Sequence, residues 1–287
     1  MELGVHLLTF GPHATAESIV SVARYADERG LHSVWVYDHL VTPAHVHSRY
    51  PYNVDGHWGV APEHPFFEAV TVLGHLSGAT SRVRLGTLVL IPTLRHPVVL
   101  AKQLATLDQL SGGRVSLGVG TGWMREEFEV LGVGFSGRGA RLEEHVALMR
   151  QTWEHPVSSF SGAYYQMPEA GTVPGPRAGR IPVLFGGHSD AALDRAARLG
   201  DGWAVTAQPS DDVVGAYAER LRRLRELCEK AGRRYEDLRI VAQSAPTAGL
   251  DHLRRLAELG VHEVSLISHG RPDLTMKLLD RLPAQIT

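Results

Sequence analysis

The sequence predicts an α/β protein whose eight parallel strands close into a (β/α)8 TIM barrel. Short apolar, β-rich segments alternate with segments of helical periodicity along the whole chain. Eight such strand and helix units fit a closed barrel better than an open doubly wound sheet. We find no linker and no internal repeat in the 287 residues. We therefore expect a single barrel domain spanning residues 1–287.

The expected strands are short apolar segments, most of which end in a polar or glycine-rich loop. The clearest unit has strands at 83–89 and 115–119, joined by a segment with Val99, Leu104 and Leu107 at helical spacing. The eight strands are expected at residues 3–8, 33–37, 83–89, 115–119, 181–185, 202–205, 238–242 and 261–267. In barrels of this type, the loops after the strands carry the chemistry.

Helices are expected between the strands. Thr15 is suited to cap the first helix, which should end at Gly30. Later helical segments are expected at 66–76 and 141–153, and a long helix ends near Ala231. Cys228, the only cysteine, lies on the apolar face of that long helix, so it should pack in the core rather than act as a reactive thiol.

Two segments depart from the regular alternation. Residues 40–65 have no period and are rich in His, Pro, Tyr and Trp, and a loop of this length is usually functional. Its aromatic residues Tyr50, Tyr52 and Trp58 suit a planar ring, although aromatic residues also plug barrel mouths. Residues 158–180 form an irregular insertion between the fourth and fifth strands. We expect both segments at the active-site mouth, where they would select the substrate.

Charge and composition favour work on small molecules. Lys+Arg 29 against Asp+Glu 31 gives a formal net charge of -2, so no basic field would attract nucleic acid or an anionic membrane. The N-terminal residues contain no signal-peptide pattern, and one cysteine allows no intramolecular disulfide. We expect a cytoplasmic protein.

Asp38 and His39 end the second expected strand, where a catalytic residue belongs. A histidine titrates near neutrality and can donate or accept a proton, and the adjacent carboxylate could orient it. The histidines of the 40–65 loop are irregularly spaced and lack a convincing carboxylate partner. We expect no metal site.

Two glycine-containing turns are candidate ligand sites. Gly186, Gly187, His188 and Ser189 end the fifth strand and open a helix, which suits an anion, although Ser189 could simply cap that helix. In the segment 118–123, glycines would let the backbone and the Thr121 hydroxyl approach a ligand. The glycine spacing there does not fit a dinucleotide fingerprint. Trp123 and Trp203 stand at strand ends, where they could contact a planar ligand.

Several motifs together resemble the bacterial luciferase-like monooxygenase superfamily, across nearly the whole chain. They are residues 84–89, 95–97, 101–108, 111–114, 118–123, 186–189 and 201–203. Within it, Val36-Tyr37-Asp38-His39 resembles the branch that uses the deazaflavin coenzyme F420, whereas many flavin mononucleotide (FMN) members carry Glu-His-His at this place.

The resemblance implies a cofactor ring at the C-terminal mouth of the barrel. The ring would lie against the end of the third strand, at Thr87, Leu88 and Val89, with a non-prolyl cis peptide at Leu88-Val89. Phosphate would be held by the loop after the fifth strand and by Thr121. The other cofactor-binding residues would be ones that end neighbouring strands: Asp38, His39, Gly122, Trp123, Gly186, Gly187, His188 and Trp203.

The resulting hypothesis is an F420-dependent oxidoreductase that transfers a hydride to or from a small organic substrate, with His39 handling the proton and Asp38 supporting it. The alternatives are an FMN-dependent monooxygenase and a non-catalytic flavin-binding protein. The sugar-phosphate dehydrogenases of the branch carry an acid where this chain has Trp123, which argues against glucose-6-phosphate. The resemblance also implies a homodimer.

Overall fold

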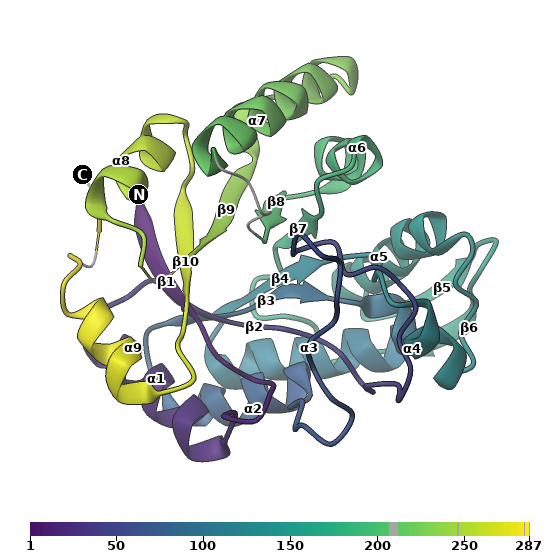
Figure 1. Cartoon of the computed structure of the whole chain (residues 1–287). Helices are drawn as coiled ribbons and strands as arrows, with labels where there is room; N and C mark the ends of the chain where they lie inside the picture. Colours follow the sequence, from purple (N-terminus) through teal and green to yellow (C-terminus); the bar gives the residue numbers. More distant parts are fainter. Residues whose placement is uncertain (207–211, 246, 284, 287) are drawn as a thin grey trace.

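The computed structural model describes residues 1–206, 212–245, 247–283 and 285–286. Eight parallel strands form a closed barrel in the order β1-β10-β9-β8-β7-β4-β3-β2 (Figure 1). These strands are β1 (Glu2–His6), β2 (Ser33–Val36), β3 (Arg84–Leu90), β4 (Val115–Val119), β7 (Val183–Gly186), β8 (Gly202–Val205), β9 (Arg239–Ser244) and β10 (Glu263–Ile267). Each expected strand overlaps one of them, so the predicted TIM barrel is confirmed.

Helices surround the barrel (Figure 1). They are α1 (Ala16–Glu28), α2 (Ala69–Ala79), α3 (Pro97–Ser111), α4 (Arg125–Val130), α5 (Arg138–Glu154), α6 (Asp190–Leu199), α7 (Val213–Lys230), α8 (Leu250–Glu258) and α9 (Pro272–Leu279), with 3-10 turns η1 (Pro92–Leu94) and η2 (Tyr235–Asp237). Thr15 caps α1 as predicted. Helix α2 begins later than expected because Glu68 caps it by accepting a hydrogen bond from Thr71 N. No helix in the described ranges is long and apolar enough to span a membrane.

The expectation of an irregular insertion at residues 158–180 was wrong. Residues 158–180 contain most of an antiparallel hairpin, β5 (Val157–Ser161) and β6 (Gln166–Gly171), which lies beside α5 (Figure 1). The Glu144 carboxylate of α5 accepts hydrogen bonds from the hairpin turn, and Arg177 N donates to Asp108 of α3 at 2.8 Å. The segment ends where β7 begins, at the N-terminal end of that strand, and none of its residues is among those that line the cavity at the C-terminal ends of the strands.

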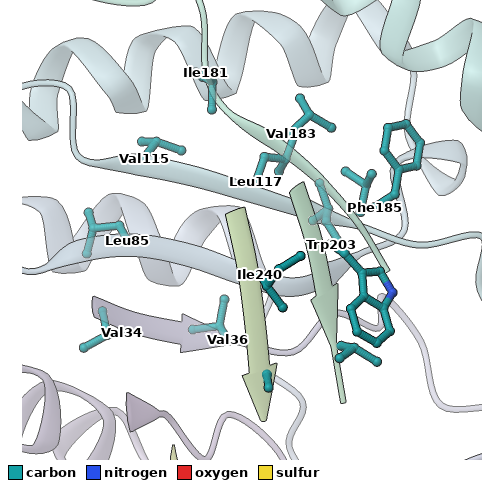
Figure 2. Close-up of a cluster of buried hydrophobic side chains, with 14 of the residues drawn as sticks. Val34, Val36, Leu85, Val115, Leu117, Ile181, Val183, Phe185, Trp203 and Ile240 are labelled. Carbon is teal, nitrogen blue, oxygen red and sulfur yellow. The ribbon is translucent and has the colours of Figure 1, made fainter. Parts of the chain in front are cut away.

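The main core lies between the barrel and its helices. Outward-facing strand residues such as Leu85, Leu117 and Phe185 pack there with almost no exposed surface (Figure 2). Cys228 of α7 belongs to this cluster and is 0% exposed, as expected from its helical spacing. Side chains on the other face of each strand point into the barrel, because successive strand residues face opposite sides.

The barrel interior changes from apolar to polar toward the C-terminal ends of the strands. Trp35 and Val241 belong to a buried apolar cluster, and two residues further along β2 and β9 come Tyr37 and Gln243. Gln243 Nε2 lies 2.8 Å from His6 Nδ1 and donates to Tyr37 Oη at 2.7 Å. The rings of His6 and Tyr37 stack with centroids 3.6 Å apart. Burial lowers the pKa of His6 to about 3, so this imidazole is neutral at ordinary pH.

We predict that His6 makes the folded protein sensitive to acid. In the unfolded chain His6 should titrate near 6.5, well above its folded pKa, so the unfolded state binds more protons and stability falls as the pH drops below that value. The contribution of His6 should fall by about 2 kcal/mol between pH 7 and pH 5. Urea unfolding at both pH values measures the drop in the free energy of unfolding from pH 7 to pH 5. This drop should be smaller in His6→Gln than in wild type by the same amount, about 2 kcal/mol. The exposed control His57→Gln should behave as wild type, and equal losses in His6→Gln and wild type would contradict the prediction.

Candidate active site

A cavity of about 540 Å³ opens at the C-terminal ends of the barrel strands. This volume is within the range of small-molecule and cofactor sites. Most of the predicted site residues line it: Asp38, His39, Tyr50, Tyr52, Trp58, Leu88, Val89, Thr121, Gly122, Trp123, Gly186, Gly187 and His188. The fold therefore brings together residues that lie up to 150 positions apart in the chain.

Thr87 and Trp203 do not line this cavity. Thr87 is 0% exposed, and its hydroxyl donates to Gly118 O on β4 at 2.8 Å. Trp203 faces the core between barrel and helices (Figure 2), because its neighbour Ala204 takes the inward position on β8. Trp203 Nε1 nevertheless donates to Gly187 O at 2.9 Å, so it supports the Gly187 turn from behind.

His39 is held by a buried carboxylate that the sequence did not reveal as its partner. His39 Nδ1 lies 2.6 Å from Glu127 Oε2, and Glu127 is 0% exposed. The other carboxylate oxygen accepts from Leu40 N at 2.7 Å and from Val41 N at 3.4 Å. Since an ionised carboxylate only accepts hydrogen bonds, Nδ1 carries the proton in this contact. Nε2 is then the imidazole nitrogen that remains for exchange with a ligand.

Asp38 does not support His39. Consecutive residues after β2 point to opposite sides, and the Asp38 carboxylate instead forms a bidentate pair with Arg95, with N–O distances of 2.8 and 2.7 Å. Asp38 also accepts from Ile91 N at 2.9 Å, and Arg95 extends the network to Glu68 at 2.6 Å. Asp38 therefore ties the end of β2 to the end of β3, and the expected orienting role belongs to Glu127.

The floor of the cavity is formed where β3 ends. The Leu88-Val89 peptide bond is cis, as the resemblance implied, and the pairing register between β3 and β4 shifts at this point. Val89 projects beside two glycines, Gly120 directly after β4 and Gly186 at the end of β7. A Cβ atom would lie 2.6 Å from a Val89 methyl group at Gly120, and equally close at Gly186. Glycine at both positions leaves the room that Val89 occupies.

A turn with glycine backbone leads from β7 into α6. Gly187 has φ +111, and a Cβ there would lie 3.0 Å from Ala192 Cβ. The Ser189 side chain caps α6 by accepting from Ala192 N at 3.2 Å, so its capping role is observed. His188 Nε2 donates to Thr206 O at 2.7 Å, and burial lowers the pKa of His188 to about 4. At neutral pH His188 adds no positive charge to this turn.

The 40–65 loop supplies aromatic side chains around His39. The ring centroid of Trp58 lies 5.2 Å from that of His39, 5.1 Å from that of Tyr50 and 5.3 Å from that of Trp123. The loop is tied to α4, because Glu126 Oε1 accepts from His47 N at 2.9 Å and Ser48 N at 3.0 Å. The two acidic residues at the start of α4 thus fix both His39 and the first part of the loop.

The cavity also includes residues that sequence reasoning missed. Phe10, after β1, and Phe66, before α2, both line it. Among the described residues, the arginines that line the cavity are Arg49 and Arg138. Arg138 Nε donates to Gly122 O at 3.1 Å. The pair Glu126-Glu127 was visible as an acidic start after Trp123, but nothing in a single sequence indicates that Glu127 is buried against a residue 88 positions away.

Comparison with known proteins extends the likeness to named relatives. A family model for luciferase-like monooxygenases matches residues 1–272. An uncharacterised protein of Mycobacterium tuberculosis is 35% identical over 246 residues, which are 85% of this chain and 83% of that protein. A protein of Kineococcus radiotolerans named F420-dependent glucose-6-phosphate dehydrogenase is 34% identical, over 97% of this chain and 81% of the relative.

A similar solved structure is that of an F420-dependent secondary alcohol dehydrogenase in complex with an F420-acetone adduct. It superposes with a TM-score of 0.80 over 99% of this chain and 98% of that chain, at 18% identity. Such low identity supports the barrel fold alone. The family match across most of the sequence, together with the relatives above 30% identity, shows that the chain is an enzyme of the luciferase-like monooxygenase family.

Proposed function

We propose that the protein is an oxidoreductase that binds the deazaflavin F420 in this cavity and catalyses hydride transfer between the cofactor and a small organic substrate. The observation that carries the proposal is the His39–Glu127 pair, which presents one oriented imidazole nitrogen to a cavity of cofactor size. A relative matching nearly the whole chain is named as F420-dependent, which supports this cofactor class.

The cavity fits a planar ring with an anionic substituent. Val89 and the glycines beside it form a floor, and the aromatic residues of the 40–65 loop form a wall that suits a flat ring. At the Gly187 turn, the N-terminus of α6 offers backbone N–H groups and a positive dipole end. Asp190, in the first turn of α6, is paired with Arg223 at 2.8 Å, which offsets its repulsion of an anion. Arg138 adds a cation to the cavity wall.

His39 would handle the proton that accompanies the hydride. A bound deazaflavin would supply the hydride chemistry, and it reacts poorly with oxygen. His39 Nε2 would then give a proton to the substrate oxygen or take one from it. Glu127 would hold the ring in one orientation and stabilise the imidazolium form when it occurs. The surrounding aromatic side chains would limit access of water to this nitrogen.

The second candidate is an FMN-dependent monooxygenase. A single anion-binding turn is sufficient for the phosphate of FMN, and the family as a whole is described as monooxygenases. A non-catalytic flavin-binding protein is less well supported, because such a protein needs no oriented histidine beside the ring. The choice of cofactor separates these candidates.

We predict that the purified protein binds reduced F420 more tightly than reduced FMN and turns over without oxygen. Fluorescence titration with each cofactor measures the first property, and turnover in an anaerobic chamber measures the second. Preferential FMN binding with oxygen-dependent product formation would favour the monooxygenase. Tight binding without any reaction across a broad substrate panel would favour the non-catalytic alternative.

Gly187→Val should weaken F420 binding by at least about 1.4 kcal/mol, or tenfold. A branched side chain at φ +111 would strain the backbone, and its Cβ would crowd the start of α6, where the anion is expected. Gly232→Val is the matched control, because Gly232 also has positive φ but lies outside the cavity lining. Equal affinities for the two variants would place the anion elsewhere.

His39→Asn should keep F420 affinity and lower turnover by about 10² or more, the usual effect of losing a general acid or base. Glu127→Gln can still accept from Leu40 N, but it loses the charge that stabilises imidazolium, so it should lower kcat more than it changes KM. Glu129→Gln is the control, since Glu129 lies on the same helix and is exposed. A His39→Asn variant with turnover within a few-fold of wild type would refute the proton-transfer role.

A further inference from the structure

Two arginines line the cavity without a carboxylate to balance their charge. Arg138, at the start of α5, is half-buried, and Arg49 is an exposed residue of the 40–65 loop. Arg49 donates to Val54 O at 3.2 Å, and Arg138 Nε donates to Gly122 O at 3.1 Å. Neither guanidinium lies within salt-bridge distance of a carboxylate in the described ranges. Carbonyl groups are neutral, so both unit charges remain unbalanced by the protein.

Further positive charge surrounds Arg138. Its guanidinium carbon lies 3.9 Å from the centroid of the Phe135 ring, and that of Arg125 lies 4.5 Å from the same centroid. Burial lowers the pKa of Arg138, and the like charges of Arg125 and Arg195 lower it further. Arg195 is paired with Glu143 at 3.1 Å, whereas Arg125 has no acidic partner among the described residues. This edge of the cavity therefore carries a positive potential.

The carboxylates close to this edge are already engaged. Asp38 is the acidic residue among the described lining residues, and both of its oxygens accept hydrogen bonds from Arg95. Glu126, which follows Arg125 in the chain, accepts from two backbone N–H groups of the 40–65 loop, at 2.9 and 3.0 Å. An anionic group of a ligand would therefore meet cations without competition. A guanidinium is suited to such a group, because its planar set of donors matches a carboxylate.

Aromatic rings connect this cationic edge with His39. The rings of His39 and Tyr50 both contact that of Trp123, with centroids 6.0 and 5.1 Å away. Arg49 directly precedes Tyr50 in the chain, and Arg138 binds the carbonyl group of the residue before Trp123. A ligand with a flat apolar body can thus lie against these rings, with one end near His39 and an acidic end at the arginines.

We propose that the substrate is a small organic carboxylate with a flat apolar body, and that Arg49 and Arg138 bind its carboxylate group. The inference rests on the proposed function and specifies the substrate class of the same cavity. The anionic substituent of the cofactor remains at the Gly187 turn. Because Arg49 belongs to the 40–65 loop and Arg138 to α5, a carboxylate held by both would also tie this loop to the barrel.

Three ligands of similar shape but different charge test the substrate class. Benzoate is an anion, benzamide is neutral and benzamidine is a cation. The protein is first saturated with F420, or with FMN if F420 does not bind, so that the site for the cofactor's anion is filled. In ligand-observed NMR titrations, benzoate should bind at least tenfold more tightly than benzamide, and benzamidine should bind most weakly. This difference should shrink as the salt concentration rises. Benzamide binding as tight as that of benzoate, or no binding of any of the three, would overturn the proposal.

Arg49→Gln and Arg138→Gln test the two contacts. Each variant should weaken benzoate binding at least fivefold and leave benzamide binding unchanged, which also shows that the cavity is intact. Arg49→Lys and Arg138→Lys keep the charge and should lose less benzoate affinity than the glutamine variants. Unchanged benzoate binding in both glutamine variants, or an equal loss of benzamide binding, would refute the carboxylate contact.

Arg125→Gln is the matched control. Arg125 is also without an acidic partner among the described residues and lies over the same Phe135 ring, but it is not a lining residue. Benzoate binding should change less than twofold in this variant. A loss equal to that of Arg138→Gln would indicate a diffuse field instead of a binding site, and would overturn the proposal.

A titration without cofactor identifies the source of the anion, so that the two proposals can fail separately. If benzoate binds through the arginines only when the cofactor is absent, these residues hold the cofactor's own anion, and only the substrate class is refuted. A protein that binds FMN but not F420, and still prefers benzoate, refutes the proposed cofactor and leaves the carboxylate site in place. A protein that binds neither cofactor refutes both proposals.

Discussion

The buried Glu127 carboxylate is the interaction on which the site depends most. One side chain, 0% exposed, accepts from His39 Nδ1 and from the backbone of Leu40 and Val41. A buried charge is tolerated only when several hydrogen bonds compensate its lost hydration. These contacts therefore couple two features: the orientation of the histidine and the path of the chain as it enters the 40–65 loop. Losing the carboxylate would leave one buried and two partly buried donors without this acceptor.

Alternation along the strands explains which residues reach the cavity and which support it. After β2, Tyr37 and His39 face inward, and Asp38 between them turns toward Arg95. On β8, Ala204 faces inward, and Trp203 packs outward yet still holds Gly187 O through its indole N–H. Adjacent residues thus have separate tasks. The inward set can contact ligands, and the outward set fixes the loops that carry them.

The sequence predicted features that depend on local patterns. Barrel strands are short apolar segments with strong β preference, and His39 was identifiable because it ends such a strand. Glu127 was not, since its contact with His39 spans 88 positions and α4 is only 6 residues long. The β5-β6 hairpin was missed because its strands are mostly exposed: Ser158 and Met167 are their buried residues, which gives little alternation to detect. The orientation of Asp38 also required the structure.

The distribution of charge in the cavity follows from these constraints. Arg95 pairs with Asp38 and Glu68. Burial alone would lower the pKa of Arg95, and the two carboxylates raise it instead. The N-terminus of α6 and Arg138 supply positive potential at one part of the cavity wall. Aromatic rings and neutral hydroxyl groups form the other part. Under the proposed function, the proton moved by His39 would be a change of charge in direct contact with the Glu127 carboxylate. In such low-dielectric surroundings, the orientation of one imidazole against one carboxylate has a large effect on that step.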